Sequence, residues 1–361
     1  MDWEQEVAQV LRVGVLGAGW AGTGHTAAYR HLPDVEVCAL WSRSSDRADA
    51  LASALDSPTL QVYQEWEELI TRGGCDVISI ATPPMLRSAP FLLALEYGCH
   101  VLVEKPMSVG VGEAADMVAA AERASTVTAC CFNWRYAPAL QAAKWMILDG
   151  ALGEIRDVRT EWFARLSSDF FHARPWSANM DVANGSLGEG LAHDLDKVRF
   201  LTGLEFLKIA SVITPIMIKQ DSYRVDGGRS VHLAELTGGV LAQLGLAVTT
   251  GLNQWRLTVV GDEGSLTVPD EGTTLLRQRH DDAEPLVVDF PPSDEEGDSE
   301  DLLQRTWNAL IADFVGAVRD NDQTLHNQPD LPTLTDGLRT EQVIAAARQS
   351  NTERRWVDIG E

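Results

Sequence analysis

The sequence predicts an N-terminal α/β domain followed by a C-terminal α+β domain with a large, mostly antiparallel open sheet. The chain has 361 residues, enough for two domains, and 45% of them are hydrophobic. Strand-like and helix-like segments alternate up to residue 132. Strand-like segments separated by Gly-Gly, Asp-Gly and Gly-Asp turns dominate from residue 133. We therefore place the two domains at residues 1–132 and 133–361.

Short apolar runs and helical stretches alternate along the first domain. The predicted strands are residues 12–16, 35–41, 77–81, 101–103 and 127–132. The predicted helices are residues 22–30, 45–55, 65–71, 90–97 and 111–123. This alternation favours right-handed βαβ units on a parallel sheet.

The second domain begins with a predicted helix at residues 138–148. Strands are expected at residues 155–163, 208–217, 231–235, 240–248, 255–260, 265–268 and 286–290. A helix at 187–200 interrupts them, and two helices, 302–319 and 334–348, end the chain. The acidic stretch 293–301 is expected to form a solvated loop.

Charge and composition exclude several classes of partner. The formal net charge of −24 argues against a nucleic-acid interface, which needs a basic face. No apolar run reaches the length of a membrane span, and residues 1–6 lack the features of a signal peptide. We expect no metal site and a cytoplasmic protein whose cysteines are buried free thiols, because their spacing is not that of metal ligands: Cys38, Cys75, Cys99, Cys130 and Cys131.

A glycine-rich loop follows the first predicted strand and opens the first predicted helix. Gly17 permits a tight turn, Gly19 allows a pyrophosphate to approach the backbone, and Gly22 allows close packing of helix on strand. The amides of the helix start, with Trp20 and Ala21, face the phosphates. In this context the loop predicts a Rossmann dinucleotide-binding domain.

The end of the second strand predicts which dinucleotide binds. An acidic residue is expected there to hold the ribose 2′-hydroxyl, but Ser42 occupies its place. Arg43 and Arg47 lie nearby, and guanidinium groups suit a 2′-phosphate. We therefore predict NADP(H), with NAD(H) as the alternative.

Glu104 and then Lys105 follow the apolar run 101–103. Pro106 ends that strand, because proline cannot continue the ladder of a central strand. The Glu104–Lys105 pair is therefore expected at the carboxyl edge of the sheet, where open α/β proteins bind ligands. Taken alone, Lys105 fits either a surface cap or a functional group.

Four motifs together resemble the Gfo/Idh/MocA oxidoreductase family, which includes glucose–fructose oxidoreductase and inositol dehydrogenase. They are A-T-P-P at 81–84, G-x-H-V-x-x-E-K-P at 98–106, N-x-R-x-x-P at 133–138 and D-G-L-R at 336–339. The E-K-P motif is the most specific, and the match runs almost end to end. The resemblance implies that the last helix, about 334–348, packs back on the N-terminal domain.

The second-domain motif of the family is present in altered form. His193 and Asp196 fit its H-x-x-D, whereas Glu189 stands where the family has Asp and Leu191 replaces a common Gly. On a regular helix, Glu189, His193 and Asp196 would share one face, at spacings of four and three. Arg87 is a further departure, at a position where the family often has His.

The resemblance implies an NAD(P)-dependent oxidoreductase that acts on a secondary alcohol of a sugar, cyclitol or related polyol. A neutral histidine can accept the hydroxyl proton, and a lysine can stabilise the developing alkoxide. The implied catalytic residues are Lys105, His193 and Glu189, and those against the substrate are Lys105, Arg174, Trp176, Glu189 and His193. The implied cofactor residues are Gly17, Gly19, Trp20, Ala21, Gly22, Ser42, Arg43, Arg47, Ala81, Thr82, Pro83, Glu104, Lys105 and Asn133.

Several roles stay open at this level. Glu189 could hold a substrate hydroxyl or orient His193, and Glu104 is expected to orient Lys105. Trp176 fits packing equally well, Asp196 could cap or pair within its helix, and Asp194 is expected on a solvated face.

Other functions and assemblies also stay open. Some family members use bound NAD to assist glycoside cleavage, and others sense nucleotides without catalysis. The family's open sheet commonly packs face to face, which implies a homodimer or homotetramer.

Overall fold

The computed structural model describes residues 10–219, 222–249, 251–290 and 302–360. The chain forms two compact units. The first comprises Met1–Glu104, Asp116–Cys131 and Gly297–Leu334, and the second comprises Lys105–Ala115, Phe132–Glu296 and Thr335–Glu361. This division differs from the single expected boundary at residue 132, because two segments cross it. The acidic stretch 293–301, expected to be a solvated loop, lies outside the described residues.

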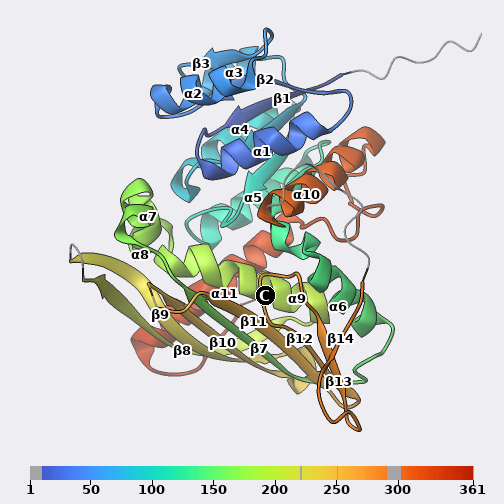
Figure 1. Ribbon diagram of the computed structural model, residues 1–361. Helices are drawn as coiled ribbons and strands as arrows, with labels where there is room; N and C mark the ends of the chain where they lie inside the picture. The colour runs from blue at the N-terminus through green and yellow to red at the C-terminus, as the bar shows by residue number, and fades with distance from the viewer. Residues whose placement is uncertain (1–9, 220–221, 250, 291–301, 361) are drawn as a thin grey trace, which may run out of the picture. The chain divides into compact units, whose positions relative to one another are not determined.

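The first unit contains a six-stranded parallel sheet in the order β3-β2-β1-β4-β5-β6, which is the Rossmann order (Figure 1). Its strands are β1 Leu11–Leu16, β2 Val35–Trp41, β3 Gln61–Tyr63, β4 Val77–Ile80, β5 His100–Glu104 and β6 Thr128–Cys131. The central strands are almost wholly buried, as near-continuous apolar runs predict. The predicted parallel sheet is confirmed. The three-residue β3 was missed because Gln61 interrupts any apolar run.

Among the described residues, six helices belong wholly or mainly to the first unit. They are α1 Trp20–His31, α2 Ser45–Leu55, α3 Trp66–Arg72, α4 Ser88–Glu96, α5 Val111–Arg123 and α10 Leu302–Asp320. The C-terminal helix α10 lies beside α1 (Figure 1). An added Cβ at Gly24 would lie 2.2 Å from the ring of Trp307, so this glycine admits the indole and brings α10 into the first unit.

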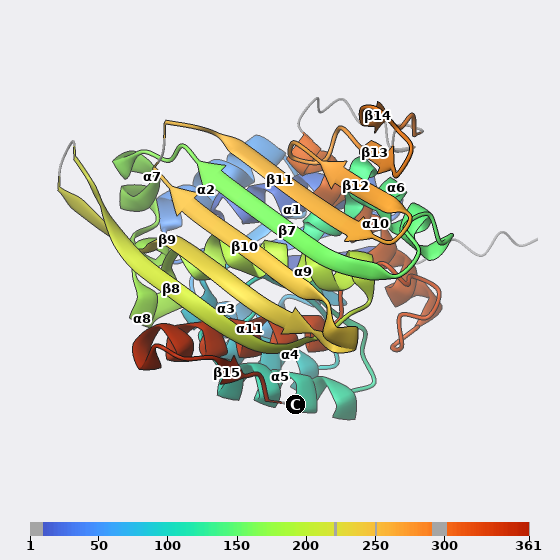
Figure 2. The same ribbon diagram turned by 90° about the horizontal axis from the view of Figure 1, so that it is seen from below.

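The second unit is built on a nine-stranded sheet in the order β14-β13-β12-β11-β7-β10-β9-β8-β15. Its strands are β7 Ile155–Ala164, β8 Phe206–Ile218, β9 Tyr223–Leu236, β10 Leu241–Val248, β11 Gln254–Gly261, β12 Gly264–Val268, β13 Leu276–Arg279, β14 Leu286–Val287 and β15 Val357–Asp358. Only the β7–β10 pair is parallel among the described strand pairs of this sheet. The predicted mostly antiparallel open sheet is confirmed, and Figure 2 looks onto its broad face.

The helices of the second unit are mostly short. They are α6 Pro138–Leu148, α7 Ser168–Ala173, α8 Met180–Ala183, α9 Ala192–Thr202 and α11 Leu334–Glu353, with the 3₁₀ turns η2 Asn133–Tyr136 and η3 Pro175–Ala178. The predicted helix at 187–200 is in fact a π-turn, η4 Leu187–Leu191, followed by α9.

Side chains of α11 protect an edge of the sheet. Ser350 Oγ and Asn351 Oδ1 accept hydrogen bonds from the β8 amides of Ser211 and Ile213, at 2.9 and 2.8 Å. Unpaired strand amides are thereby satisfied without a further strand. Almost all of α11 therefore belongs to the second unit, and its predicted packing on the N-terminal domain stays a prediction. Among the described helices, none is long and apolar enough to cross a membrane.

Candidate active site

The loop after β1 is built for close backbone approach. Gly17 has a φ of 120°, and an added Cβ at Gly22 would lie 1.8 Å from the Gly17 carbonyl oxygen. Gly19 is the N-cap of α1, and an added Cβ there would meet nothing within 4 Å. No side chain caps this turn in the described structure. Uncapped amides beside an open glycine fit the pyrophosphate of a dinucleotide.

Trp20 and Ala21, two predicted cofactor residues, begin α1. Trp20 is exposed, and its ring packs edge to face against Trp307 at a centroid distance of 4.9 Å. Ala21 follows it on the same turn. The contact with α10 was not foreseen, because no local pattern links residues so distant in sequence.

The carboxyl end of β2 presents two exposed arginines. Ser42 Oγ accepts a hydrogen bond from the Ser44 amide at 3.3 Å, and Ser44 Oγ caps α2 by accepting from the Arg47 amide. The side chains of Arg43 and Arg47 are both exposed. This segment therefore offers hydroxyl and guanidinium groups at the edge of the sheet that the glycine loop also occupies.

Arg87 locks the loop after β4 against the end of β5. The side chain is buried, with Nε donating to the Thr82 carbonyl and a terminal nitrogen donating to the Glu104 carbonyl, each at 2.7 Å. Ala81 and Pro83 belong to the same loop, and the Ala81 carbonyl lies under Gly17. The departure from the family's histidine thus has a structural role here: it joins the β4 and β5 ends.

Glu104 belongs to a buried polar cluster that sequence reasoning missed. Its Oε1 lies 3.1 Å from His25 Nε2, while His25 Nδ1 lies 2.9 Å from Ser79 Oγ. Cys131 Sγ lies 3.5 Å from the same Nε2. The side chains of His25, Glu104 and Cys131 are close enough to hold a metal ion, but these contacts already form a hydrogen-bonded network. The predicted orientation of Lys105 by Glu104 stays a prediction.

Lys105, the first residue after β5, meets the π-turn of the second unit. Its Nζ donates to the Glu189 carbonyl at 3.0 Å and lies 3.8 Å from the Glu189 carboxylate. The Lys105 side chain is 11% exposed, and the Lys105–Pro106 peptide bond is cis. Lys105 is therefore no surface cap, and its contact with Glu189 is one that the sequence did not predict.

Two glycines shape the π-turn around Glu189. An added Cβ at Gly190 would lie 2.0 Å from the Trp162 ring, and one at Gly188 would lie 3.3 Å from Pro106. The Ala192 amide donates five residues back, to the Leu187 carbonyl. Because the α-helical ladder is interrupted here, Lys105 can take the Glu189 carbonyl. The expected regular face shared by Glu189 and His193 is therefore wrong at this turn.

His193 is the second residue of α9, and aromatic rings surround its imidazole. The ring centroids of Phe132 and Trp134 each lie 6.4 Å from that of His193. Its Nδ1 is buried without a hydrogen-bond partner among the described residues. Burial, together with the positive charges of Lys105 and Lys197, holds the pKa of His193 well below its ordinary value. The imidazole is therefore neutral near pH 7 and can accept a proton.

Asp196 binds Arg135 and so joins motifs that are distant in sequence. Arg135 Nε donates to Asp196 Oδ2 at 2.9 Å, and its NH2 lies 3.1 Å from an Asp336 oxygen. Both Arg135 and Asp196 are buried. The N-x-R, H-x-x-D and D-G-L-R motifs thus meet in one ion-pair cluster, and Asp196 pairs outside its helix.

Asp194 is not on a solvated face, so that expectation is wrong. Its side chain is buried and accepts a hydrogen bond from Trp255 Nε1 at 2.9 Å. Its Oδ1 also lies 3.4 Å from Lys197 Nζ. A single sequence gave no sign of this buried pair, because charged residues on a helix are usually exposed.

Three predicted site residues lie in segments other than those that carry Lys105, Glu189 and His193. The Arg174 guanidinium lies 4.8 Å from the centroid of the Phe170 ring, and Trp176 lies in η3. Asn133 is buried at the start of η2. The roles of Arg174 and Trp176 toward a substrate, and of Asn133 toward a cofactor, stay predictions.

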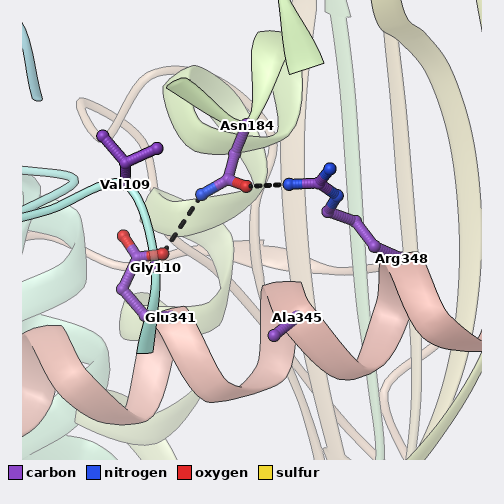
Figure 3. Close-up of a pocket in the computed structure, with 6 residues that line it drawn as sticks. All are labelled: Val109, Gly110, Asn184, Glu341, Ala345 and Arg348. Carbon is purple, nitrogen blue, oxygen red and sulfur yellow. Dashed lines mark hydrogen bonds between the residues drawn. The ribbon is translucent and has the colours of Figure 1, made fainter. Parts of the chain in front are cut away.

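A polar cavity of about 240 Å³ lies beside α11 (Figure 3). Asn184 spans it, donating to Glu341 Oε2 at 3.1 Å and accepting from Arg348 at 2.9 Å. Val109, Gly110 and Ala345 complete the lining, so no predicted site residue takes part. Because Asn184 leads into the π-turn, these bonds anchor the segment that carries Glu189.

A Rossmann sheet with a glycine-rich loop, joined to an open-sheet unit that carries Lys105 and His193, defines a nucleotide-dependent oxidoreductase. Family comparison agrees. Residues 11–131 match the oxidoreductase family with an NAD-binding Rossmann fold, and residues 140–267 match the Gfo/Idh/MocA C-terminal domain. The chain belongs to the Gfo/Idh/MocA oxidoreductase family.

Individual relatives are consistent with this assignment. The dTDP-3,4-didehydro-2,6-dideoxy-α-D-glucose 3-reductase of Streptomyces violaceoruber is 30% identical over 73% of this chain and 74% of its own length. Levoglucosan dehydrogenase of Pseudarthrobacter phenanthrenivorans is 29% identical over 74% of this chain and 65% of its own. A levoglucosan dehydrogenase structure with NADH and levoglucosan shares the fold, with a TM-score of 0.86 at 22% identity, covering 98% of this chain and 100% of its own.

Proposed function

We propose that this oxidoreductase acts on a secondary alcohol of a sugar, cyclitol or related polyol, with Lys105 and His193 handling the proton. The observation that carries the proposal is the placement of Lys105 Nζ, 3.0 Å from the Glu189 carbonyl and largely shielded from solvent. The names of the two curated relatives support a sugar-type substrate, because both act on carbohydrate rings.

The chain's own groups divide the proton chemistry between them. A bound nicotinamide supplies the hydride acceptor or donor. His193, neutral because of burial and two nearby cations, accepts the hydroxyl proton. The Lys105 ammonium stabilises the developing alkoxide in a partly dry site. Glu189, whose carboxylate lies 3.8 Å from Lys105 Nζ, orients that ammonium or binds a neighbouring hydroxyl.

Removing the lysine tests this assignment. Lys105→Ala should lower kcat/KM by roughly 10²–10⁴, the range for losing one proton-transfer or oxyanion-stabilising group. Cofactor affinity should change little, since the glycine loop carries the pyrophosphate. Steady-state rates over a panel of sugars, inositols and sugar acids, with nucleotide titrations, measure both quantities. The matched control is Lys208→Ala on β8, and full turnover in Lys105→Ala would sink the assignment.

We further propose that the cofactor is NADP(H) rather than NAD(H). Ser42 and the exposed Arg43 and Arg47 at the end of β2 support a 2′-phosphate site. The levoglucosan dehydrogenase structure contains NADH, so the proposed preference for NADP(H) needs a direct test. Fluorescence titration should show tighter binding of NADPH than NADH, and Arg43→Ala should remove the difference. Tighter binding of NADH to the native protein would refute the preference.

We also propose that the chain forms a homodimer or homotetramer through the open face of the nine-stranded sheet (Figure 2). Large apolar side chains are exposed on three neighbouring strands of that sheet: Leu207, Val212 and Met217 of β8, Val231 and Leu233 of β9, and Leu241 of β10. Val212 and Val231 are direct cross-strand partners. An apolar group of this kind supports an association surface.

A further inference from the structure

Lys197 is a buried cation that stands outside the predicted site. Its side chain is only 6% exposed. Lysine is almost never buried unless its charge is paired, and here the partners are an acidic and an aromatic side chain. Its Nζ lies 3.4 Å from Asp194 Oδ1 and 3.6 Å from the centroid of the Trp255 ring. Asp194 also accepts from Trp255 Nε1, so the ammonium is held by a carboxylate and an aromatic face at once.

The fold places this cation next to His193. Both residues lie on α9 four positions apart, so their side chains share one face of the helix. Both also meet Trp134, whose ring lies 5.6 Å from Lys197 Nζ and 6.4 Å, centroid to centroid, from His193. Trp134 therefore borders the imidazole and the ammonium together.

We propose that Lys197 is a positioning residue for His193: its buried ammonium disfavours the imidazolium and keeps the resting ring in its neutral form. The proposal rests on the proposed role of His193 as the base. A fixed neighbouring cation opposes a second positive charge, and the effect is large where water is excluded. Asp194 and Trp255 hold the cation in place, so the effect is built into the folded chain.

The charged groups around the pair set the sign of the effect. Lys105 and Lys197 act on His193, while Glu189 lies beside Lys105 and the other ring neighbours, Phe132 and Trp134, are uncharged. Burial lowers the pKa of Lys197 and the negative charges of Asp194, Asp196 and Glu271 raise it, with a net pKa of about 8. Lys197 is therefore charged throughout the acidic range in which a histidine titrates. Removing that charge must raise the pKa of His193.

The test follows the protonation of His193 in the full-length protein. Lys197→Met should raise the pH at which the His193 imidazole titrates by about 1 unit, seen by NMR with the resonance assigned from His193→Gln. The acid limb of kcat/KM should move to higher pH by the same amount. Lys197→Arg, which keeps the charge, should restore the wild-type profile. Lys208→Met, at a half-buried lysine of β8 that pairs with Glu235, is the matched control.

A second variant guards against misfolding of the first. Lys197→Gln removes the same charge but leaves a polar side chain beside Asp194, so His193 should again titrate at higher pH than in wild type. The Lys197 proposal is overturned by an unchanged His193 titration in Lys197→Met, or by shifts of opposite sign in Lys197→Met and Lys197→Gln. Full turnover in His193→Gln would instead overturn the proposed function, leaving the NMR result interpretable.

Discussion

At the scale of single residues, Arg135 has the most consequential environment. It is buried against Asp196 and reaches Asp336, so it joins three sequence motifs through charge rather than through apolar packing. Such a pair is weak evidence for stability as a unit, but the loss of one partner leaves an uncompensated buried charge. Arg135 of the N-x-R-x-x-P motif therefore serves to connect segments of the second unit.

Replacing this arginine should be costly. Arg135→Ala is expected to lower the free energy of unfolding by about 3–5 kcal/mol, since Asp196 would stay buried without its cation. Urea unfolding followed by circular dichroism measures the change. Arg156→Ala is the control, because Arg156 pairs with Asp262 at the exposed surface and should leave the midpoint almost unchanged. Equal shifts in the two variants would contradict this interpretation.

At the level of residues, the sequence named Lys105, Glu189 and His193 as site residues, and the structure shows Lys105 Nζ in contact with the Glu189 carbonyl. Burial and two nearby lysine charges hold the pKa of His193 well below its ordinary value, and its catalytic role stays a prediction. Predictions failed where the partner was remote. The buried Asp194 carboxylate accepts a hydrogen bond from Trp255. His25 contacts Glu104 although 79 positions separate the two residues in the sequence. A single sequence does not record which distant group lies opposite a side chain.

At the scale of elements, two glycines in and beside the loop between β1 and α1 have different roles. Gly22 is packed against the Gly17 carbonyl, whereas Gly19 opens onto free space. The first glycine serves the fold, and the second leaves room for a ligand.

The two glycines should respond differently to one added methyl group. Gly22→Ala should lower the free energy of unfolding by roughly 1–3 kcal/mol, because the added Cβ overpacks the turn. Gly19→Ala should keep the wild-type melting temperature while losing affinity for dinucleotide. Thermal unfolding and nucleotide titration together distinguish the two effects. A stable Gly22→Ala variant that binds nucleotide normally would show that the turn relaxes freely.

The segment 187–202 shows where element prediction stops. Its pattern favoured one helix, and the helix exists from Ala192. The π-turn before it depends on Gly190 meeting Trp162 and on Lys105 taking the Glu189 carbonyl. Both contacts come from segments that are distant in the chain, so the helical periodicity of residues 187–202 does not reveal them.

At the scale of the whole molecule, the open face of the nine-stranded sheet sets the expected assembly. Light scattering coupled to gel filtration should give a dimer or tetramer for the native chain. Val231→Glu, in the middle of the apolar face, should shift the mass toward monomer because it buries a charge in the contact. Tyr97→Glu, an equally exposed position outside that sheet, is the control. A native protein that is monomeric at every concentration would contradict the proposed assembly.

The sequence by itself determined the order of the βαβ units, the glycine-rich loop and the open sheet. These features depend on local periodicity and on residues that neighbour each other in the chain. Tertiary structure alone decided that α10 joins the first unit through Trp307 and Gly24, that a π-turn holds Lys105, and that Lys197 is buried near His193. Each of these depends on contacts between distant segments, whose free energies a local pattern does not contain.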